Sequence, residues 1–225
     1  MGVASDQSRQ VSVRRGLVVG GAGLAVLAAA QFSPGRRGQN ADADMEGRWG
    51  EDLRWARAVG IIEPAAEGPF RAAEPVTREE LAVLLYRLAG APDYPALASS
   101  PYRDVTDKAR HVCEILWLRG QGIALGAFDA TFRPTERVSR GEVCAMLCRM
   151  LRAQLAHHRG TDPFETATAS VPGVPETHRY AREIGWAADA GLIAAVSDGD
   201  RFPPDAELSR GQCVHVLRCA EELFA

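Results

Sequence analysis

The sequence lacks the motifs that mark most enzymes and nucleic-acid-binding proteins. Its five histidines are scattered, and neither a serine elbow nor a metalloprotease motif accompanies them. Lys108 is the only lysine, and a formal net charge of −3 with 7% aromatic residues argues against the basic face of a nucleic-acid binder. We therefore expect no catalytic set, no cofactor and no nucleic-acid partner.

Long apolar runs are missing except near the N-terminus. There the fifteen residues "GLVVGGAGLAVLAAA" follow Arg14 and Arg15 and end in a small-x-small cleavage site. A membrane span needs about 20 residues, so residues 1–30 are predicted to be an export signal, with a retained anchor as the alternative. "SVRRGLVV" resembles the twin-arginine type of signal, although Val13 stands where a polar residue is usual, so the ordinary secretory route stays open. We expect an exported protein that meets the membrane only through this segment.

Cysteine is scarce and odd in number, so at least one thiol is unpaired within the chain. Cys144 and Cys148 lie four residues apart on one predicted helix, but no further ligand completes a metal site, and small apolar core residues are the favoured interpretation. A disulfide from Cys113 to Cys144 or Cys148 stays open. The five cysteines are Cys113, Cys144, Cys148, Cys213 and Cys219.

What the chain does contain is one unit repeated three times. Four landmarks recur in the same order: a tryptophan, a glycine, a phenylalanine and a hydroxyl residue that opens a helix. The tryptophans are separated by 62 and 69 residues. The landmarks are Trp55, Gly60, Phe70 and Thr77; Trp117, Gly122, Phe132 and Ser139; and Trp186, Gly191, Phe202 and Ser209.

Each copy is predicted to form a helix, a long ordered loop and a second helix. The glycine ends the first helix in a left-handed cap, and the hydroxyl residue, three positions ahead of Glu or Gln, starts the second with a capping box. The loops are too long for a DNA-reading helix-turn-helix, and the period exceeds that of tetratricopeptide repeats. One apolar stripe on each second helix predicts that the copies pack together: Leu81, Leu84, Leu85 and Leu88; Val143, Met146, Leu147 and Met150; Cys213, Val216, Leu217 and Ala220.

The first residue inside each second helix is an arginine: Arg78, Arg140 and Arg210. A cation there faces the positive end of the helix dipole, which is unfavourable unless an anion binds beside it. A guanidinium also offers a planar fork to a carboxylate or phosphate. The alternative is that each arginine pairs with the acid two or three residues ahead of its cap, namely Glu74, Glu136 or Glu207.

The second copy resembles the S-layer homology module nearly end to end. It has the aromatic-x-Asp-Val opening "YRDV", the helix "ILWLRGQGI", "FRP" and the Thr-Arg-Ala-Glu-like "SRGE". The third copy keeps "IGWAADAGL", "FPPD" and "SRGQ", and the first keeps "LRWARAVGI", "FRAAEP" and "TREE" but lacks the opening. The predicted division is a signal at 1–30, a tail at 31–45, modules at 46–91, 98–152 and 173–225, and a linker at 153–172.

The resemblance implies an all-α fold of three modules packed as a pseudo-threefold bundle. It implies a non-catalytic cell-surface role, in which grooves between modules bind an anionic, often pyruvylated, secondary polymer of the cell wall. Because copy two has the full motif, we rank Arg140 first and expect one or two working grooves. Peptidoglycan-associated proteins are the other expected partners. An exported protein-interaction module is the alternative function, and a small wall hydrolase ranks third. The implied site is Arg140, Arg78 and Arg210, with Ser139, Thr77 and Ser209 beside them, and with Trp117, Trp55, Trp186 and Gly122 as weaker candidates.

Overall fold

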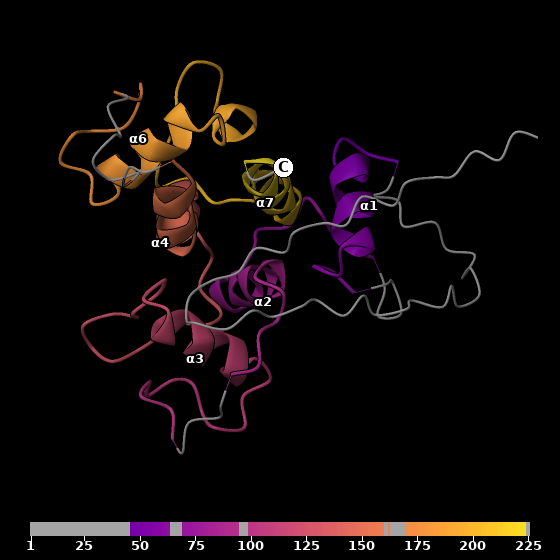
Figure 1. The fold of residues 1–225 in the computed structure, drawn as a ribbon, viewed down its shortest axis with the longest axis vertical. Helices are drawn as coiled ribbons and strands as arrows, with labels where there is room; N and C mark the ends of the chain where they lie inside the picture. Colours follow the sequence, from indigo (N-terminus) through magenta and orange to yellow (C-terminus); the bar gives the residue numbers. More distant parts are fainter. Residues whose placement is uncertain (1–45, 64–68, 95–98, 160–161, 163–169, 224–225) are drawn as a thin grey trace, which may run out of the picture.

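A computed structural model describes residues 46–63, 69–94, 99–159, 162 and 170–223. The predicted signal, the tail and most of the linker lie outside these ranges. The described residues form helices and no strand, so the all-α prediction is confirmed (Figure 1). None of these helices is both long and apolar enough to cross a membrane. The elements are α1 (Gly50–Ala58), α2 (Arg78–Leu88), α3 (Val112–Gly120), α4 (Arg140–Arg159), α6 (Ala181–Asp189), the 3-10 helix η3 (Ala194–Val196) and α7 (Arg210–Glu222).

The first helix of each copy, α1, α3 or α6, ends as predicted at its glycine. Gly60, Gly122 and Gly191 have φ of 80°, 70° and 76°, the left-handed region that a side chain would strain. In copy one the amide of Ile61 donates to the carbonyl of Ala56 at 2.8 Å, and the other two copies repeat this bond. This 6→1 bond defines a Schellman cap, which turns the chain into the loop.

The second helices, α2, α4 and α7, begin at the predicted caps. Thr77 and Ser209 each form a complete capping box with the residue three positions on. At Ser139 the Glu142 amide donates to the serine hydroxyl at 3.2 Å, and the Glu142 carboxylate contacts an arginine of copy one. Helix α4 also continues into the predicted linker, ending at Arg159.

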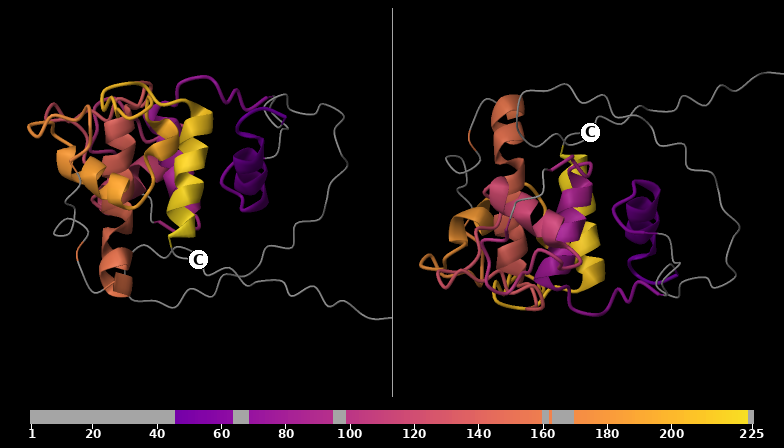
Figure 2. Two further views of the ribbon diagram at one scale, coloured as in Figure 1. Left: turned by 90° about the horizontal axis from the view of Figure 1, so that it is seen from above. Right: turned by 90° about the horizontal axis from the view of Figure 1, so that it is seen from below.

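The α-helices with the most extensive contacts pair between copies, and within copy three the short η3 contacts α7. Helix α1 packs on α7, α3 on α2 and α6 on α4, so each first helix covers the second helix of the preceding copy. Figure 1 shows α2, α4 and α7 in the middle with α1, α3 and α6 outside them, and Figure 2 shows α7 between α4 and α1. Because the first helix of each copy packs on the second helix of another copy, no copy buries its core alone.

Three backbone hydrogen bonds close a ring where the copies meet. The amide of Val76 donates to Leu208, that of Leu208 to Val138, and that of Val138 back to Val76, at 2.9–3.0 Å. These residues immediately precede the three helix caps, and all three are buried. The contacts therefore run cyclically through the copies, although a regular pseudo-threefold packing stays a prediction.

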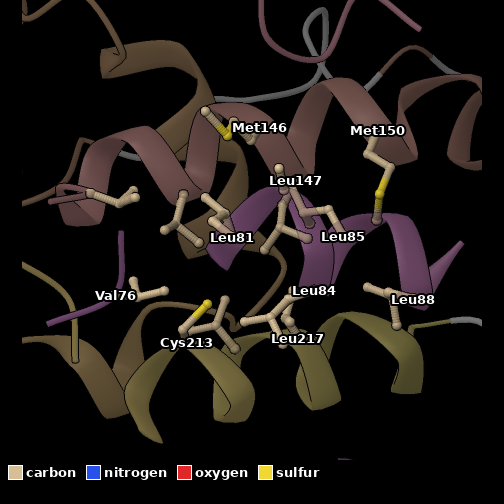
Figure 3. Packing of buried hydrophobic residues seen from close by; sticks show 14 of the residues in the cluster. Val76, Leu81, Leu84, Leu85, Leu88, Met146, Leu147, Met150, Cys213 and Leu217 are labelled. Carbon is tan, nitrogen blue, oxygen red and sulfur yellow. The ribbon is translucent and has the colours of Figure 1, made fainter. Parts of the chain in front are cut away.

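The core lies between the three second helices. Figure 3 shows α2 between α4 and α7, with Leu84 and Leu85 facing the two neighbours. All twelve residues of the predicted stripes are buried. Phe132 and Phe202 are 0% and 1% exposed, as expected for loop aromatics that enter the core, whereas Phe70 is only half-buried.

All five cysteines are free, so the disulfide from Cys113 considered above is wrong. Cys144, Cys148 and Cys213 are buried core residues, as favoured, and burial raises the pKa of each thiol to about 12. Such thiols are inert because the thiolate is the reactive form.

The aromatic-x-Asp-Val opening of copy two fixes its loop. The carboxylate of Asp104 accepts hydrogen bonds from the amides of Phe132 and Arg133 at 2.8 and 2.6 Å, and Tyr102 packs on the Phe132 ring. In copy three, which lacks the aspartate, the Phe202 amide donates instead to the carbonyl of Pro172. The motif therefore holds the loop phenylalanine in place beside the arginine of the preceding copy.

Candidate functional site

Each of the helix-start arginines Arg78 and Arg210 reaches into the following copy. Arg78 donates through Nε to the carbonyl of Phe132 at 2.7 Å and pairs with Glu142. Arg210 repeats this in copy one, donating to the carbonyl of Phe70 at 2.9 Å and pairing with Glu80 at 2.6 Å. Each guanidinium also lies over the phenyl ring of that phenylalanine, 4.8 or 5.2 Å from its centre. One constellation is thus built twice from different copies.

The acids that pair with these arginines differ from the predicted ones. Glu74, Glu136 and Glu207 were expected, but their carboxylates contact the loop arginines Arg71, Arg133 and Arg137. The partners are instead the capping-box glutamates of the next copy, because the cyclic packing brings those helix starts alongside. Sequence spacing within one copy gives no signal for such a contact.

The helix-start amides are also already occupied. Arg78 and Glu79 donate their backbone N–H groups to the carbonyls of Glu136 and Pro134, both at 2.9 Å. The equivalent amides of α4 and α7 donate to the loops of copies three and one. These N–H groups are therefore not free to receive an anion, so attraction for an anion has to come from side chains.

Arg140, which the sequence ranks first, has a different environment. Its counterpart acid is missing, since Gln212 stands where copies one and two have Glu80 and Glu142. Arg140 pairs with Asp198 at 3.0 Å, and its Nε atom is buried without a hydrogen-bond partner. Its side chain is 10% exposed, and it lines none of the three grooves described next.

Two of the three grooves are rich in arginine. The Arg210 groove, with a volume of about 400 Å³, carries five arginines against three glutamates: Arg57, Arg71, Arg87, Arg110 and Arg210 against Glu63, Glu74 and Glu80. The Arg78 groove, of about 170 Å³, carries four against two: Arg78, Arg133, Arg149 and Arg179 against Glu136 and Glu142. Both grooves are therefore positive on a chain whose net charge is −3.

The third groove carries more acidic than basic side chains. The His215 groove, of about 460 Å³, lies between α1 and α7. It carries Arg48 and Arg218 against Glu51, Asp52 and Glu222, with Trp49, His215 and Cys219. An anionic ligand that suits the first two grooves is therefore repelled here.

The grooves contain arginines that the sequence comparison missed, although fixed spacings reveal them. Arg48, Arg110 and Arg179 each lie seven residues ahead of the landmark tryptophan and two residues before the first residue of α1, α3 or α6. Arg71 and Arg133 directly follow the landmark phenylalanine, where copy three has Pro203. Arg87 and Arg149 lie ten residues after the helix cap, where copy three has Cys219.

The weaker site candidates have structural roles. Trp117 and Trp186 are buried in the core, and the indole N–H of Trp55 donates to Glu221 at 2.9 Å. Gly122 forms a helix cap, and the hydroxyls of Thr77, Ser139 and Ser209 accept from their own helices. Within the described ranges no three His, Cys, Asp or Glu side chains are placed to hold a metal ion.

No family model matches the chain. It is similar to cell surface glycoprotein 1 of Acetivibrio thermocellus, with 28% identity over 159 residues, which is 69% of this chain and 7% of that protein. A cellulosome-anchoring protein of the same species is 26% identical over 74% of this chain and 37% of its own length. A cell surface protein of Thermoanaerobacter kivui is 27% identical over 54% of this chain and 15% of its own length. The chain thus matches only a minor part of each of these relatives.

Proposed function

We propose that this chain is an exported S-layer homology protein that binds an anionic glycopolymer of the cell wall in its Arg210 and Arg78 grooves. The observation that carries the proposal is that two grooves with an excess of arginine lie on a chain whose net charge is negative. Cell-surface and anchoring proteins among its relatives support a surface location and a non-catalytic role. We therefore rank Arg210 and Arg78 above Arg140.

Two rim arginines, Arg71 and Arg133, are the side chains best placed to contact the polymer first. They are 60% and 47% exposed, and each pairs only within its own loop. Their backbones have φ of 57° and 61°, a left-handed conformation that costs a non-glycine residue about 1 kcal/mol. Such strain is retained where it serves a site. Copy three has Pro203 at this position, whose ring does not allow a positive φ.

The deeper arginines would then orient the bound anion. Arg210 and Arg78 are held by a carbonyl, a glutamate and a phenyl ring, so their planar forks have fixed directions. A pyruvyl or other carboxylate of the polymer can share such a fork with the protein glutamate. This arrangement predicts binding that weakens as the salt concentration rises.

Sedimentation with purified cell-wall sacculi tests the proposal. The full chain is expected to sediment with sacculi, and to stay in solution once the secondary polymer has been stripped from them. The double variant Arg71→Gln/Arg133→Gln is expected to lose most binding with an unchanged melting temperature. Arg137→Gln is the matched control, because Arg137 forms an equally exposed loop pair with Glu207 but lines neither groove.

Two outcomes would contradict this function. Binding that survives both polymer stripping and the double substitution, together with recovery of a stoichiometric protein partner, favours the exported protein-interaction module. Release of soluble fragments from labelled sacculi by the purified chain favours a wall hydrolase.

A further inference from the structure

The His215 groove contains a chain of three side chains with the order thiol, imidazole, carboxylate. The Sγ atom of Cys219 lies 3.5 Å from Nε2 of His215, and Nδ1 of the same ring lies 3.0 Å from the Asp52 carboxylate. Asp52 also accepts from Arg218 at 3.1 Å, and its side chain is only 8% exposed. With Nδ1 protonated and donating to Asp52, the lone pair on Nε2 faces the thiol.

Comparison between the copies shows how this site differs from the equivalent charged pair of copy two. Arg149, the equivalent of Cys219, pairs with Glu183, the equivalent of Asp52, at 3.3 Å between α4 and α6. In the α1–α7 pair Cys219 stands at the position of that arginine, and the neighbouring Arg218 contacts Asp52 instead. His215 stands where copy two has Ala145. The α1–α7 pair thus keeps a buried carboxylate and an arginine and adds a histidine and a thiol, in the groove with the negative balance.

The surroundings hold the imidazole in place while leaving the groove open. The indole of Trp49 lies against His215, with ring centres 5.7 Å apart. That contact needs a glycine in α7, because a Cβ atom at Gly211 would lie 2.4 Å from the Trp49 ring. The groove volume of about 460 Å³ lies in the range of small-molecule sites.

We propose that Cys219 is a nucleophilic thiol that reacts with small disulfides, with His215 as its general base and Asp52 as the residue that positions His215. Nε2 of His215 removes the thiol proton, and the sulfur attacks one sulfur of the disulfide. A new bond forms between Sγ and that sulfur while the disulfide bond breaks, and the other half leaves as a thiolate that takes up a proton. The cysteine is oxidised to a mixed disulfide and the departing sulfur is reduced.

The other cysteines serve as internal references. Partial burial, together with the carboxylates of Glu222 and Asp52, raises the pKa of Cys219, so this thiol is protonated at neutral pH and needs a base. Cys113 is more exposed, and the three core thiols are buried. Without base assistance the more exposed Cys113 would be expected to react faster than Cys219.

The test uses the full native chain and 5,5′-dithiobis(2-nitrobenzoic acid), with the released thiolate followed by absorbance. In a Cys113→Ala background Cys219 is expected to react, and His215→Gln is expected to lower the rate constant about 100-fold, the lower end of what a positioned base supplies. Asp52→Asn is expected to lower it less and to move the pH–rate profile to lower pH, because the imidazolium loses its carboxylate partner. These variants leave the other charged side chains of the groove unchanged, namely Arg48, Glu51, Arg218 and Glu222.

A second background separates loss of the base from loss of the fold. With Cys219→Ala, the rate constant of Cys113 should be the same with and without His215→Gln. An unreactive Cys219 in the folded Cys113→Ala chain, or an equal rate constant with and without His215→Gln, overturns the proposal.

Discussion

Replacing Arg78 by alanine should lower the free energy of unfolding by about 3–5 kcal/mol. The substitution removes the partner of Glu142, whose side chain is 12% exposed, and leaves its carboxylate buried without a counter-charge. It also removes the hydrogen bond to the Phe132 carbonyl and the contact with that ring. Burial lowers the pKa of Arg78, an indication that desolvation of this pair is expensive.

Urea denaturation of the full chain, followed by far-UV circular dichroism, measures this loss. For a chain of this size about 3 kcal/mol corresponds to roughly 6–12 °C in melting temperature. The double variant Arg78→Ala/Glu142→Gln should recover about 1–3 kcal/mol, because glutamine carries no charge and can complete a capping box, as Gln212 does in copy three.

An exposed ion pair gives the matched control. Arg137→Ala breaks the contact with Glu207, in which both side chains are about half exposed, and should change stability by no more than about 0.5 kcal/mol. If Arg78→Ala costs no more than this control, or if the double variant is less stable than the single one, the pair is not a buried link between copies and the reasoning fails.

Three further predictions concern the helices and core. Gly122→Ala should cost about 1 kcal/mol in urea denaturation through the left-handed backbone alone, since nothing lies within 4 Å of the added Cβ; an unchanged midpoint would contradict this. Trp117→Ala should cost about 3–5 kcal/mol by the same measurement, because the indole is 1% exposed, and a milder loss would mean that the core closes over the gap. Stability should fall between pH 9 and 12: the unfolded state releases the protons of Cys144, Cys148 and Cys213, whereas the native pKa values are about 12, so the native state keeps them. Replacing Cys213 by alanine should make this loss of stability with pH less steep. If the melting temperature falls with pH as steeply as before, the raised pKa of Cys213 does not contribute to the loss.

Local signals in the sequence predicted the helices well. A helix start depends on a capping residue and the acid or amide three positions on, and a helix end depends on a glycine, so Thr77, Ser209 and Gly191 could be assigned without tertiary information. The buried stripes followed from helical periodicity alone.

Contacts between copies were the part that the sequence did not predict. The preferred order of the arginines was set by motif completeness, which gave Arg140 the first rank. Its environment depends on Gln212 and Asp198 of copy three, and no spacing within copy two reveals them. The partners of Arg78 and Arg210 were missed for the same reason.

By itself, then, the sequence determined three helix-loop-helix copies and the residues that begin, end and bury each helix, because these features depend on neighbours within a few turns. The tertiary structure decided which copy supplies each partner. The ring through Val76, Val138 and Leu208 places every helix start against the following copy's loop. That cyclic pairing gives two grooves an excess of arginine and the third a thiol, an imidazole and a carboxylate, since charge and chemistry at an interface depend on both of its sides.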